Sequence, residues 1–194
     1  MKCPSCNAGF AAAVPQCPKC KLTLRRLDIR FGALPRHSRF LTDRTGQLPL
    51  RAIAELRDLL RLFKRKFPQS LFSVFVTGAV QGGTISEYTF WLANRARFSS
   101  LSAVGGENFD LLLGIDTHSR AAALVIGYGL ESHVTERDLQ RALADAASAF
   151  YVGDYGSGIR NCVEFMMNRM RDIVKEIQDK SSSRKPLPIS AEEY

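Results

Sequence analysis

Two pairs of closely spaced cysteines open the chain and constrain its fold more than any other feature. Cys3 and Cys6 form one CxxC pair, and Cys17 and Cys20 form a second pair after ten intervening residues. A tight turn within each pair aims both sulfurs at one point, so two facing turns build a tetrahedral site of four thiolates. Zinc prefers such a site, and its closed ligand set leaves no position for a substrate. We therefore predict a structural zinc ion at these four cysteines.

Other interpretations of the cysteines remain open. A redox dithiol needs only one CxxC pair, a disulfide suits a secreted chain, and iron also binds four thiolates. The proline after the first cysteine of each pair presets the backbone for a turn, which favours the metal site. A loop this short has almost no apolar core, so metal binding must supply most of its folding free energy. The fifth cysteine, Cys162, falls on the apolar stripe of a predicted helix and is expected to be buried.

The rest of the chain has the composition of a globular protein. Of its 194 residues, 45% are hydrophobic and 24% are charged, which is enough apolar material for a core. The net charge of +8 permits contact with nucleic acid or an anionic membrane surface without identifying either. The apolar runs are far shorter than the roughly 20 residues that cross a bilayer, and the N-terminus lacks the apolar stretch of a secretion signal. We therefore expect a cytoplasmic protein that has no transmembrane segment and keeps its cysteines reduced.

The hydrophobic pattern divides the chain into three parts. Apolar residues near alternate positions of 22–31 predict a strand, so residues 1–31 are expected to form a zinc ribbon and its following strand. After a linker, residues 38–178 are expected to form the main domain. The polar segment 179–194 contains two prolines and is expected to be a disordered tail.

Within the main domain the residue spacing predicts four helices and three strands. The helices are expected at 49–66, at 86–97 with Ser86 as the N-cap, from 135 to 150 with Thr135 and Asp138 as a capping box, and from 159 to 177. The strands are expected at 71–77, 109–115 and 120–127, the second of them buried on both faces. This order predicts an α/β fold, a three-layer α/β/α sandwich around a small mixed sheet, with the zinc-ribbon knuckle at its N-terminus.

Four short motifs in this region resemble the TPM domain family. They are LTDRTGQL at 41–48, NFDLLL at 108–113, GYGLE at 127–131 and GDYGSGI at 153–159. The resemblance covers about residues 38–178, while the cysteine segment resembles the short zinc ribbons that open many bacterial proteins. Phe109 stands where the family has a glycine, and the segment 99–106 lacks the charged residues that are usual there. Gly127 and Gly129 are expected to supply a positive φ after their strand.

The family includes phosphatase-like proteins of the thylakoid lumen and the bacterial envelope. The resemblance implies an α/β/α sandwich, a calcium or magnesium ion at acidic loops, and acid phosphatase activity in some members. Residue by residue it points to Asp43, Asn108 and Asp154 as possible ligands of that cation. Each has a structural alternative: Asp43 can cap the turn at Gly46, Asp154 can cap the last helix, and Asn108 can adopt a turn geometry that few residues tolerate.

These observations favour a non-catalytic binding or scaffold protein of the bacterial cytoplasm, which joins a zinc ribbon to a TPM-like domain and has an unidentified protein as its partner. The GxSxG, HExxH and P-loop motifs are absent from the sequence. One alternative is a divalent-metal-dependent phosphatase, an acid-phosphatase-like phosphomonoester hydrolase that depends on Asp43 and Asp154. A second alternative is a nucleic-acid-binding protein, which would use the cations Lys19, Lys21, Arg25, Arg26, Arg30, Arg36 and Arg39. Aromatic residues are sparse in that region, so a solvated basic face is the competing interpretation.

Overall fold

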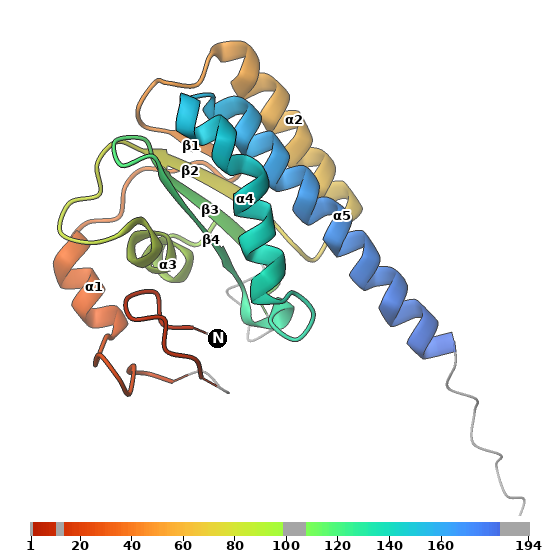
Figure 1. Cartoon of the computed structure of the whole chain (residues 1–194), viewed down its shortest axis with the longest axis horizontal. Coiled ribbons are helices and arrows are strands. Elements are labelled where there is room, and N and C mark those ends of the chain that lie inside the picture. The colour runs from red at the N-terminus through yellow and green to blue at the C-terminus, as the bar shows by residue number, and fades with distance from the viewer. Residues whose placement is uncertain (1, 11–13, 99–107, 183–194) are drawn as a thin grey trace, which may run out of the picture.

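Four short, largely apolar strands form the middle layer of the fold. The structure, a computed structural model, describes residues 2–10, 14–98 and 108–182. Its mixed sheet has the strand order β1-β2-β3-β4, in which β1, β2 and β3 run parallel and β4 returns antiparallel to β3 (Figure 1). The strands are β1 (Leu41–Asp43), β2 (Phe72–Thr77), β3 (Leu111–Asp116) and β4 (Ala121–Ile126).

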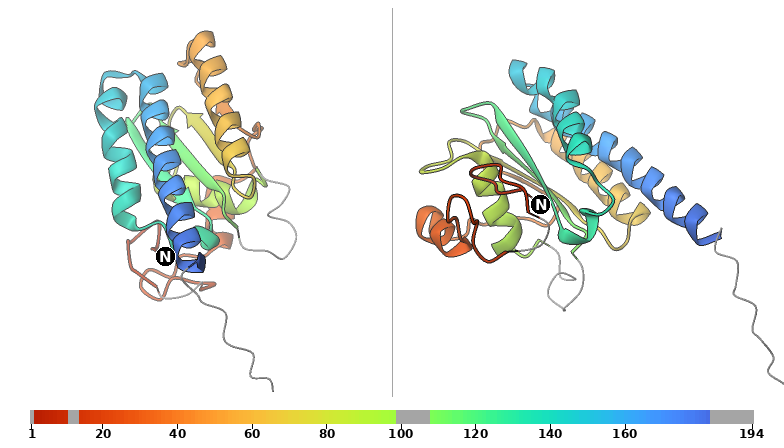
Figure 2. Two further views of the ribbon diagram at one scale, coloured as in Figure 1. Left: turned by 90° about the vertical axis from the view of Figure 1, so that its right-hand side faces the viewer. Right: turned by 60° about the horizontal axis from the view of Figure 1, so that its bottom comes forward.

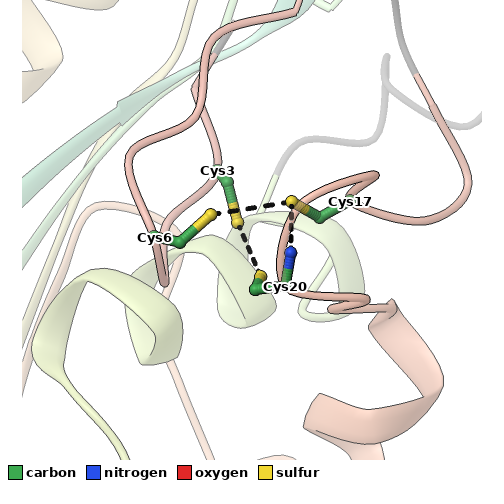
Figure 3. Close-up of side chains that lie close together, drawn as sticks. All are labelled: Cys3, Cys6, Cys17 and Cys20. Carbon is green, nitrogen blue, oxygen red and sulfur yellow. Dashed lines mark hydrogen bonds between the residues drawn. The ribbon is translucent and has the colours of Figure 1, made fainter.

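Helices cover both faces of this sheet, which confirms the predicted three-layer α/β/α sandwich. One face carries α2 (Leu50–Lys66), α4 (Glu136–Val152) and α5 (Tyr155–Ser182), and the other carries α3 (Ile85–Arg95) (Figures 1 and 2). A short 3-10 turn, η2 (Tyr128–Leu130), follows β4. The helix α1 (Leu24–Phe31) packs against α3, and the cysteine loops lie beside these two helices (Figures 1 and 3). Among the described residues, no helix is long and apolar enough to cross a membrane.

The alternation of side chains along the strands divides the core into two clusters. The larger cluster holds Val74, Leu113 and their neighbours between the sheet and α2, α4 and α5, and it includes Cys162 as predicted. The smaller cluster holds Phe75 and Leu112 with Trp91 of α3. All six residues of β3 are buried, which confirms the strand predicted to be covered on both faces.

The predicted strand at 22–31 is wrong, because this segment forms helix α1. The hydroxyl of Thr23 accepts a hydrogen bond from the amide of Arg26 and caps the helix N-terminus. Leu24, Leu27 and Phe31 then recur at the helical spacing of three and four residues and pack in the cluster around α3. A run of apolar residues this short fits the period of a strand and that of a helix. The N-cap and the packing against α3 favour the helix.

Two further helix boundaries differ from the prediction. The N-cap of α3 is Thr84 rather than Ser86, because Thr84 and Glu87 form a reciprocal capping box. The helix α5 extends to Ser182, so residues 179–182 of the predicted tail are helical, and residues 183–194 lie outside the described residues. The capping box of Thr135 and Asp138 is confirmed at the start of α4.

Glycines in the sheet region permit close contacts rather than unusual backbone angles. Gly114 of β3 faces Thr89 of α3, and a Cβ at Gly114 would lie 1.9 Å from the Thr89 hydroxyl oxygen. The positive φ predicted for Gly127 and Gly129 is wrong, since neither has one. A Cβ at Gly127 would lie 2.1 Å from the carbonyl oxygen of Asn108, and one at Gly129 would lie 2.7 Å from the ring of Phe109. The two glycines of the GYGLE motif therefore leave room for the residues that enter β3.

Candidate metal centre

The four predicted cysteine ligands converge on one point (Figure 3). Their sulfur atoms all lie within 4.8 Å of one another. Sγ of Cys3 lies 3.6 Å from Sγ of Cys20, and Sγ of Cys6 lies 3.7 Å from Sγ of Cys17. A tetrahedral zinc ion with Zn–S bonds of about 2.3 Å places its sulfurs about 3.8 Å apart. The cluster therefore has the size and the ligand set that fit a structural zinc ion.

The two CxxC loops have the same backbone geometry. The carbonyl of Cys3 accepts a hydrogen bond from the amide of Asn7, and the carbonyl of Cys17 accepts one from the amide of Lys21. Asn7 and Lys21 each follow the second cysteine of a pair, and each has a positive φ, 56° and 60° respectively. This left-handed residue turns the chain after the second cysteine, so both sulfurs of each loop point to the same side.

The cysteine cluster is part of the smaller core rather than a separate appendage. Cys3 is 2% exposed and Cys17 is 5% exposed, and both pack in the cluster that contains Leu27, Trp91 and Leu92. Cys6 and Cys20 are half-buried at the edge of the same cluster. Burial of two sulfurs limits access of water to the site, which stabilises bound metal against exchange.

Amide groups lower the pKa of one of these thiols. Burial acts to raise the pKa of Cys17, but the amide N–H groups of Cys20 and Lys19 and the neighbouring thiols lower this pKa to about 6. The amide nitrogen of Cys20 lies 3.4 Å from Sγ of Cys17. Burial raises the pKa of Cys3 to about 12. Because zinc binds thiolates, the amides that favour the thiolate of Cys17 also favour its bond to the metal.

A buried carboxylate of α3 anchors the first metal loop to the domain. Glu87 is 4% exposed, and it accepts hydrogen bonds from Nη1 of Arg30 at 2.9 Å and from the amide of Thr84 at 3.1 Å. The hydroxyl of Ser5, which lies between Cys3 and Cys6 in sequence, also bonds to this carboxylate. Burial acts to raise the pKa of Glu87, but these donors hold the pKa below its ordinary value. The carboxylate is thus ionised and joins the first metal loop, α1 and α3.

A second carboxylate makes the reverse connection, from α1 to α3. Asp28 of α1 accepts hydrogen bonds from the indole of Trp91 at 2.9 Å and from two guanidinium nitrogens of Arg95 at 2.9 and 2.8 Å. The hydrogen bonds from Arg95 and Trp91 lower the pKa of Asp28. Sequence reasoning identified neither Asp28 nor Glu87 as an anchor; the capping-box spacing of Thr84 and Glu87 was the one signal available.

Asp43, a predicted cation ligand, accepts hydrogen bonds from the loop that follows it. Its Oδ1 accepts hydrogen bonds from the amides of Thr45 and Gly46 and from the hydroxyl of Thr45, and its Oδ2 accepts one from the amide of Leu48. Burial acts to raise the pKa of Asp43, but these four donors lower it. Capping of the turn at Gly46, the structural alternative, is therefore what Asp43 does in this structure.

Asp154 and Asn108 lie at opposite edges of the sheet. Oδ1 of Asp154 accepts the amide of Ser157 and so caps α5, whose Tyr155 hydroxyl donates to the carbonyl of Thr117 just after β3. This places Asp154 at the edge where the parallel strands end, as Asp43 is. Asn108 precedes β3 at the other edge, where its side-chain oxygen accepts the amide of Asp110. The structure therefore does not bring Asn108 together with the two carboxylates.

The sequence did not indicate one further carboxylate, which lies where the parallel strands end. Asp116 ends β3, is 6% exposed, and accepts hydrogen bonds from the amides of Val80, His118 and Ser119. A lone aspartate after an apolar strand resembles an ordinary turn residue, so the sequence carried little signal for it. Among the described residues, the cysteines alone bring three or more Cys, His, Asp or Glu ligand atoms close enough to hold an ion.

Comparisons with known proteins agree with this fold. A family model described as the TPM domain matches residues 41–169, which run from β1 into α5 and leave out the cysteine loops. No match was found among curated proteins.

Three solution structures share the fold at low sequence identity. The BA42 protein of Bizionia argentinensis matches with a TM-score of 0.57 and 10% identity, over 68% of this chain and 86% of that chain. An N-terminal domain from P. gingivalis matches with a TM-score of 0.58 and 19% identity, over 80% and 92%. An N-terminal domain from Corynebacterium glutamicum matches with a TM-score of 0.51 and 19% identity, over 83% and 95%. At these identities the similarity shows the fold alone.

Proposed function

The chain belongs to the TPM domain family, and from that membership and its cysteine cluster we propose that it is a non-catalytic, zinc-stabilised binding protein. Four sulfurs within 4.8 Å of one another carry this proposal. A zinc ion there has only protein ligands, so its contribution is to hold the first residues and α1 on α3 rather than to activate water. The TPM domain then serves as the scaffold on which this N-terminal surface is presented.

The contacts of the acidic loops support a binding role over catalysis. Asp43 and Asp116 use their oxygens for seven hydrogen bonds from their own and neighbouring loops. These hydrogen bonds use lone pairs that a calcium or magnesium ion would need from the same carboxylates. We assign these carboxylates to loop stabilisation.

A divalent-metal-dependent phosphatase is the second candidate, and one observation favours it. Asp43 and Asp154 both lie where the parallel strands end, the edge at which open α/β sheets bind ligands. The pKa of each is lowered by hydrogen bonds, so both carboxylates are ionised at neutral pH. The predicted ligands Asp43, Asp154 and Asn108 do not come together, so they do not fit a calcium or magnesium ion, and we derive no catalytic step through such an ion.

We place the protein in the bacterial cytoplasm as part of the same proposal. Five free cysteines support a reducing compartment, since oxidised pairs would remove the zinc ligands.

The test combines metal analysis with a phosphatase assay. Purified full-length protein should contain one zinc ion per chain, and it should hydrolyse p-nitrophenyl phosphate no faster than buffer with added calcium or magnesium. Asp43→Ala/Asp154→Ala provides the control for contaminating activity. Turnover that disappears in this double variant while the fold is retained would support the phosphatase and contradict a non-catalytic role. Protein without stoichiometric metal would contradict the zinc centre.

A further inference from the structure

The helical conformation of α1 gathers cations that a strand would have separated. In a strand, Arg25 and Arg26 would point to opposite faces. In a helix, Arg25 and Arg26 lie about 100° apart on one exposed face, which also holds Ile29. Leu24, Leu27 and Phe31 occupy the opposite arc and pack against the smaller core. One face of α1 is therefore basic and faces away from the domain.

Two lysines of the second metal loop extend this face. Lys19 lies between Cys17 and Cys20, and Lys21 lies two residues before Thr23, the N-cap of α1. Nη1 of Arg26 lies 3.3 Å from the carbonyl oxygen of Lys21, so the loop and the helix meet at this point. We call Lys19, Lys21, Arg25 and Arg26 the α1 basic face; all four are exposed.

The charges of the α1 basic face are not neutralised by neighbours. Within the described ranges, no ion pair joins these four side chains to a carboxylate. The acidic residues at the α1–α3 interface, Asp28 and Glu87, already pair with Arg95 and Arg30. Arg30 is thus directed inward, and four cations remain free to contact an external anion.

Arg39 does not belong to this face, although the sequence places it in the same basic region. Its guanidinium lies over the ring of Phe40, and its charge lowers the pKa of Lys64 at the end of α2 after the larger effect of burial. Arg39 therefore lies apart from the cations of the second metal loop and α1.

We propose that the α1 basic face binds the phosphate backbone of double-stranded nucleic acid. The proposal rests on the zinc centre above, because the metal fixes Lys19 and Lys21 next to the N-terminus of α1. Four cations on a rigid surface match the closely spaced phosphates of a duplex. The N-terminus of α1 adds its partial positive charge at the same place.

The surface fits a duplex better than a single strand or a membrane. Binding of single strands uses exposed aromatic rings on which bases stack, and the exposed face of α1 has none. Binding to a membrane surface requires a broad apolar helix face in the headgroup region. The apolar face of α1 is buried against α3, and Ile29, at 78% exposed, is its one apolar residue that is well exposed.

The number of cations sets the expected dependence on salt. If four phosphates are neutralised, the logarithm of the binding constant falls against the logarithm of salt concentration with a slope of about −3.6. An increase from 50 to 200 mM NaCl should then weaken binding by about 150-fold. Removal of two of the four cations should reduce this slope by about half.

The experiment uses zinc-loaded full-length protein and a fluorescein-labelled 20-base-pair DNA of mixed sequence, with binding followed by fluorescence anisotropy. Arg25→Gln/Arg26→Gln removes two charges from the α1 basic face. Arg57→Gln/Arg65→Gln removes two exposed charges from α2, on the other face of the sheet, and is the matched control. Affinity at 50 mM NaCl should fall at least tenfold in the first variant and less than twofold in the second.

Lys19→Gln/Lys21→Gln provides an independent variant that leaves α1 intact, and it should also lose at least tenfold in affinity. Equal losses in the α1 and α2 variants would show a net-charge effect and overturn the proposal. So would the absence of duplex binding at 50 mM NaCl, or binding to phosphatidylglycerol-containing vesicles without binding to the duplex. Zinc analysis of each preparation distinguishes the two proposals. Protein that contains zinc but does not bind the duplex contradicts the DNA-binding proposal and leaves the zinc centre in place.

Discussion

Nη1 of Arg30 in α1 lies 2.9 Å from Oε2 of Glu87 in α3, and this contact joins segments that are 57 residues apart in the chain. The same carboxylate bonds to Ser5 in the first metal loop. Glu87 thus links the first metal loop to α3, the helix that covers one face of the sheet. The zinc ligands, α1 and α3 behave as one structural unit for this reason.

Loss of the Glu87 charge should therefore destabilise the whole fold. In Glu87→Gln the guanidinium of Arg30 keeps its place without an ionised partner, while the neutral amide accepts weaker hydrogen bonds from Ser5 and Thr84. Since Arg30 is partly exposed, we expect a loss of about 1–3 kcal/mol in the free energy of unfolding. Urea unfolding of the zinc-loaded protein at pH 7 measures this loss.

Glu55→Gln is the matched control for this substitution. Glu55 of α2 also forms ion pairs with arginine, here with Arg51 and Arg160, but these ion pairs lie at the surface. Solvent screening should leave the unfolding midpoint of this variant close to that of the wild type. Equal effects of Glu55→Gln and Glu87→Gln would contradict the anchoring role of Glu87.

Trp91, the single tryptophan of the chain, should report the state of the metal site. It is 1% exposed and packs in the same cluster as Cys3 and Cys17. Removal of zinc by an excess of a strong chelator should loosen this cluster and admit water to the indole. We expect the emission maximum of Trp91 to shift to longer wavelength, and to return when zinc is restored.

Serine substitutions distinguish a metal effect from a general effect of the thiols. Cys17→Ser should lose stoichiometric zinc and show the red-shifted emission without chelator. Cys162→Ser changes a thiol that is buried between α5 and the sheet, in the other core cluster, and should keep both zinc and the native emission. An emission maximum that is identical in the apo and zinc-loaded protein would rule out the coupling of the metal to α3.

The sequence contained the metal site because its geometry is local. Two residues between cysteines and a following proline define each loop, so the convergence of Cys3, Cys6, Cys17 and Cys20 follows from spacing alone. The conformation of residues 22–31, by contrast, depends on contacts with residues far away in the sequence. Its apolar residues fit a strand as well as a helix, and the helix is selected by contacts with Trp91 and Arg95, which lie more than sixty residues further on.

The acidic loops show a second limit of sequence reasoning. The family motifs pointed to Asp43, Asn108 and Asp154, but motifs do not specify at which end of the strands each of these residues lies. The parallel register places the end of β1 and the start of β3 at opposite edges, so Asp43 and Asn108 are separated by the length of a strand. Gly127 illustrates the same point, since its requirement comes from the carbonyl of Asn108 rather than from its own φ.

Asp43 should make stability depend on pH in the acidic range. Its lowered pKa means that the folded protein binds this proton less readily than the unfolded chain does. Its stabilising contribution is therefore complete above the ordinary value of 3.8 and is lost as the pH falls through the lower folded value. Asp43→Asn should cost about 1–2 kcal/mol at pH 7, and this difference from the wild type should shrink as the pH approaches 3.

Chemical unfolding of both proteins between pH 7 and 3 measures that convergence. Zinc release in acid affects both proteins alike, so the difference between them isolates the carboxylate. Asp58→Asn, on the exposed side of α2, should differ little from the wild type at any pH. A constant difference between Asp43→Asn and the wild type across the range would contradict the assigned hydrogen bonds.

The packing of α3 on the sheet depends on Gly114 in the middle of β3. A Cβ at this position would lie 1.9 Å from Oγ1 of Thr89 and 3.0 Å from its Cβ, so Gly114→Ala must displace α3. Overpacking of this kind should cost at least about 2 kcal/mol in the free energy of unfolding. Thr89→Ala removes the nearest atom, and its hydroxyl bonds only to the carbonyl of Ile85 one turn earlier, so this change alone should cost less. The double variant should therefore be more stable than the sum of the single effects, with part of the loss remaining because the Thr89 Cβ stays in place. Thermal unfolding of the four proteins measures this coupling, and strictly additive losses would show that α3 does not rest on Gly114.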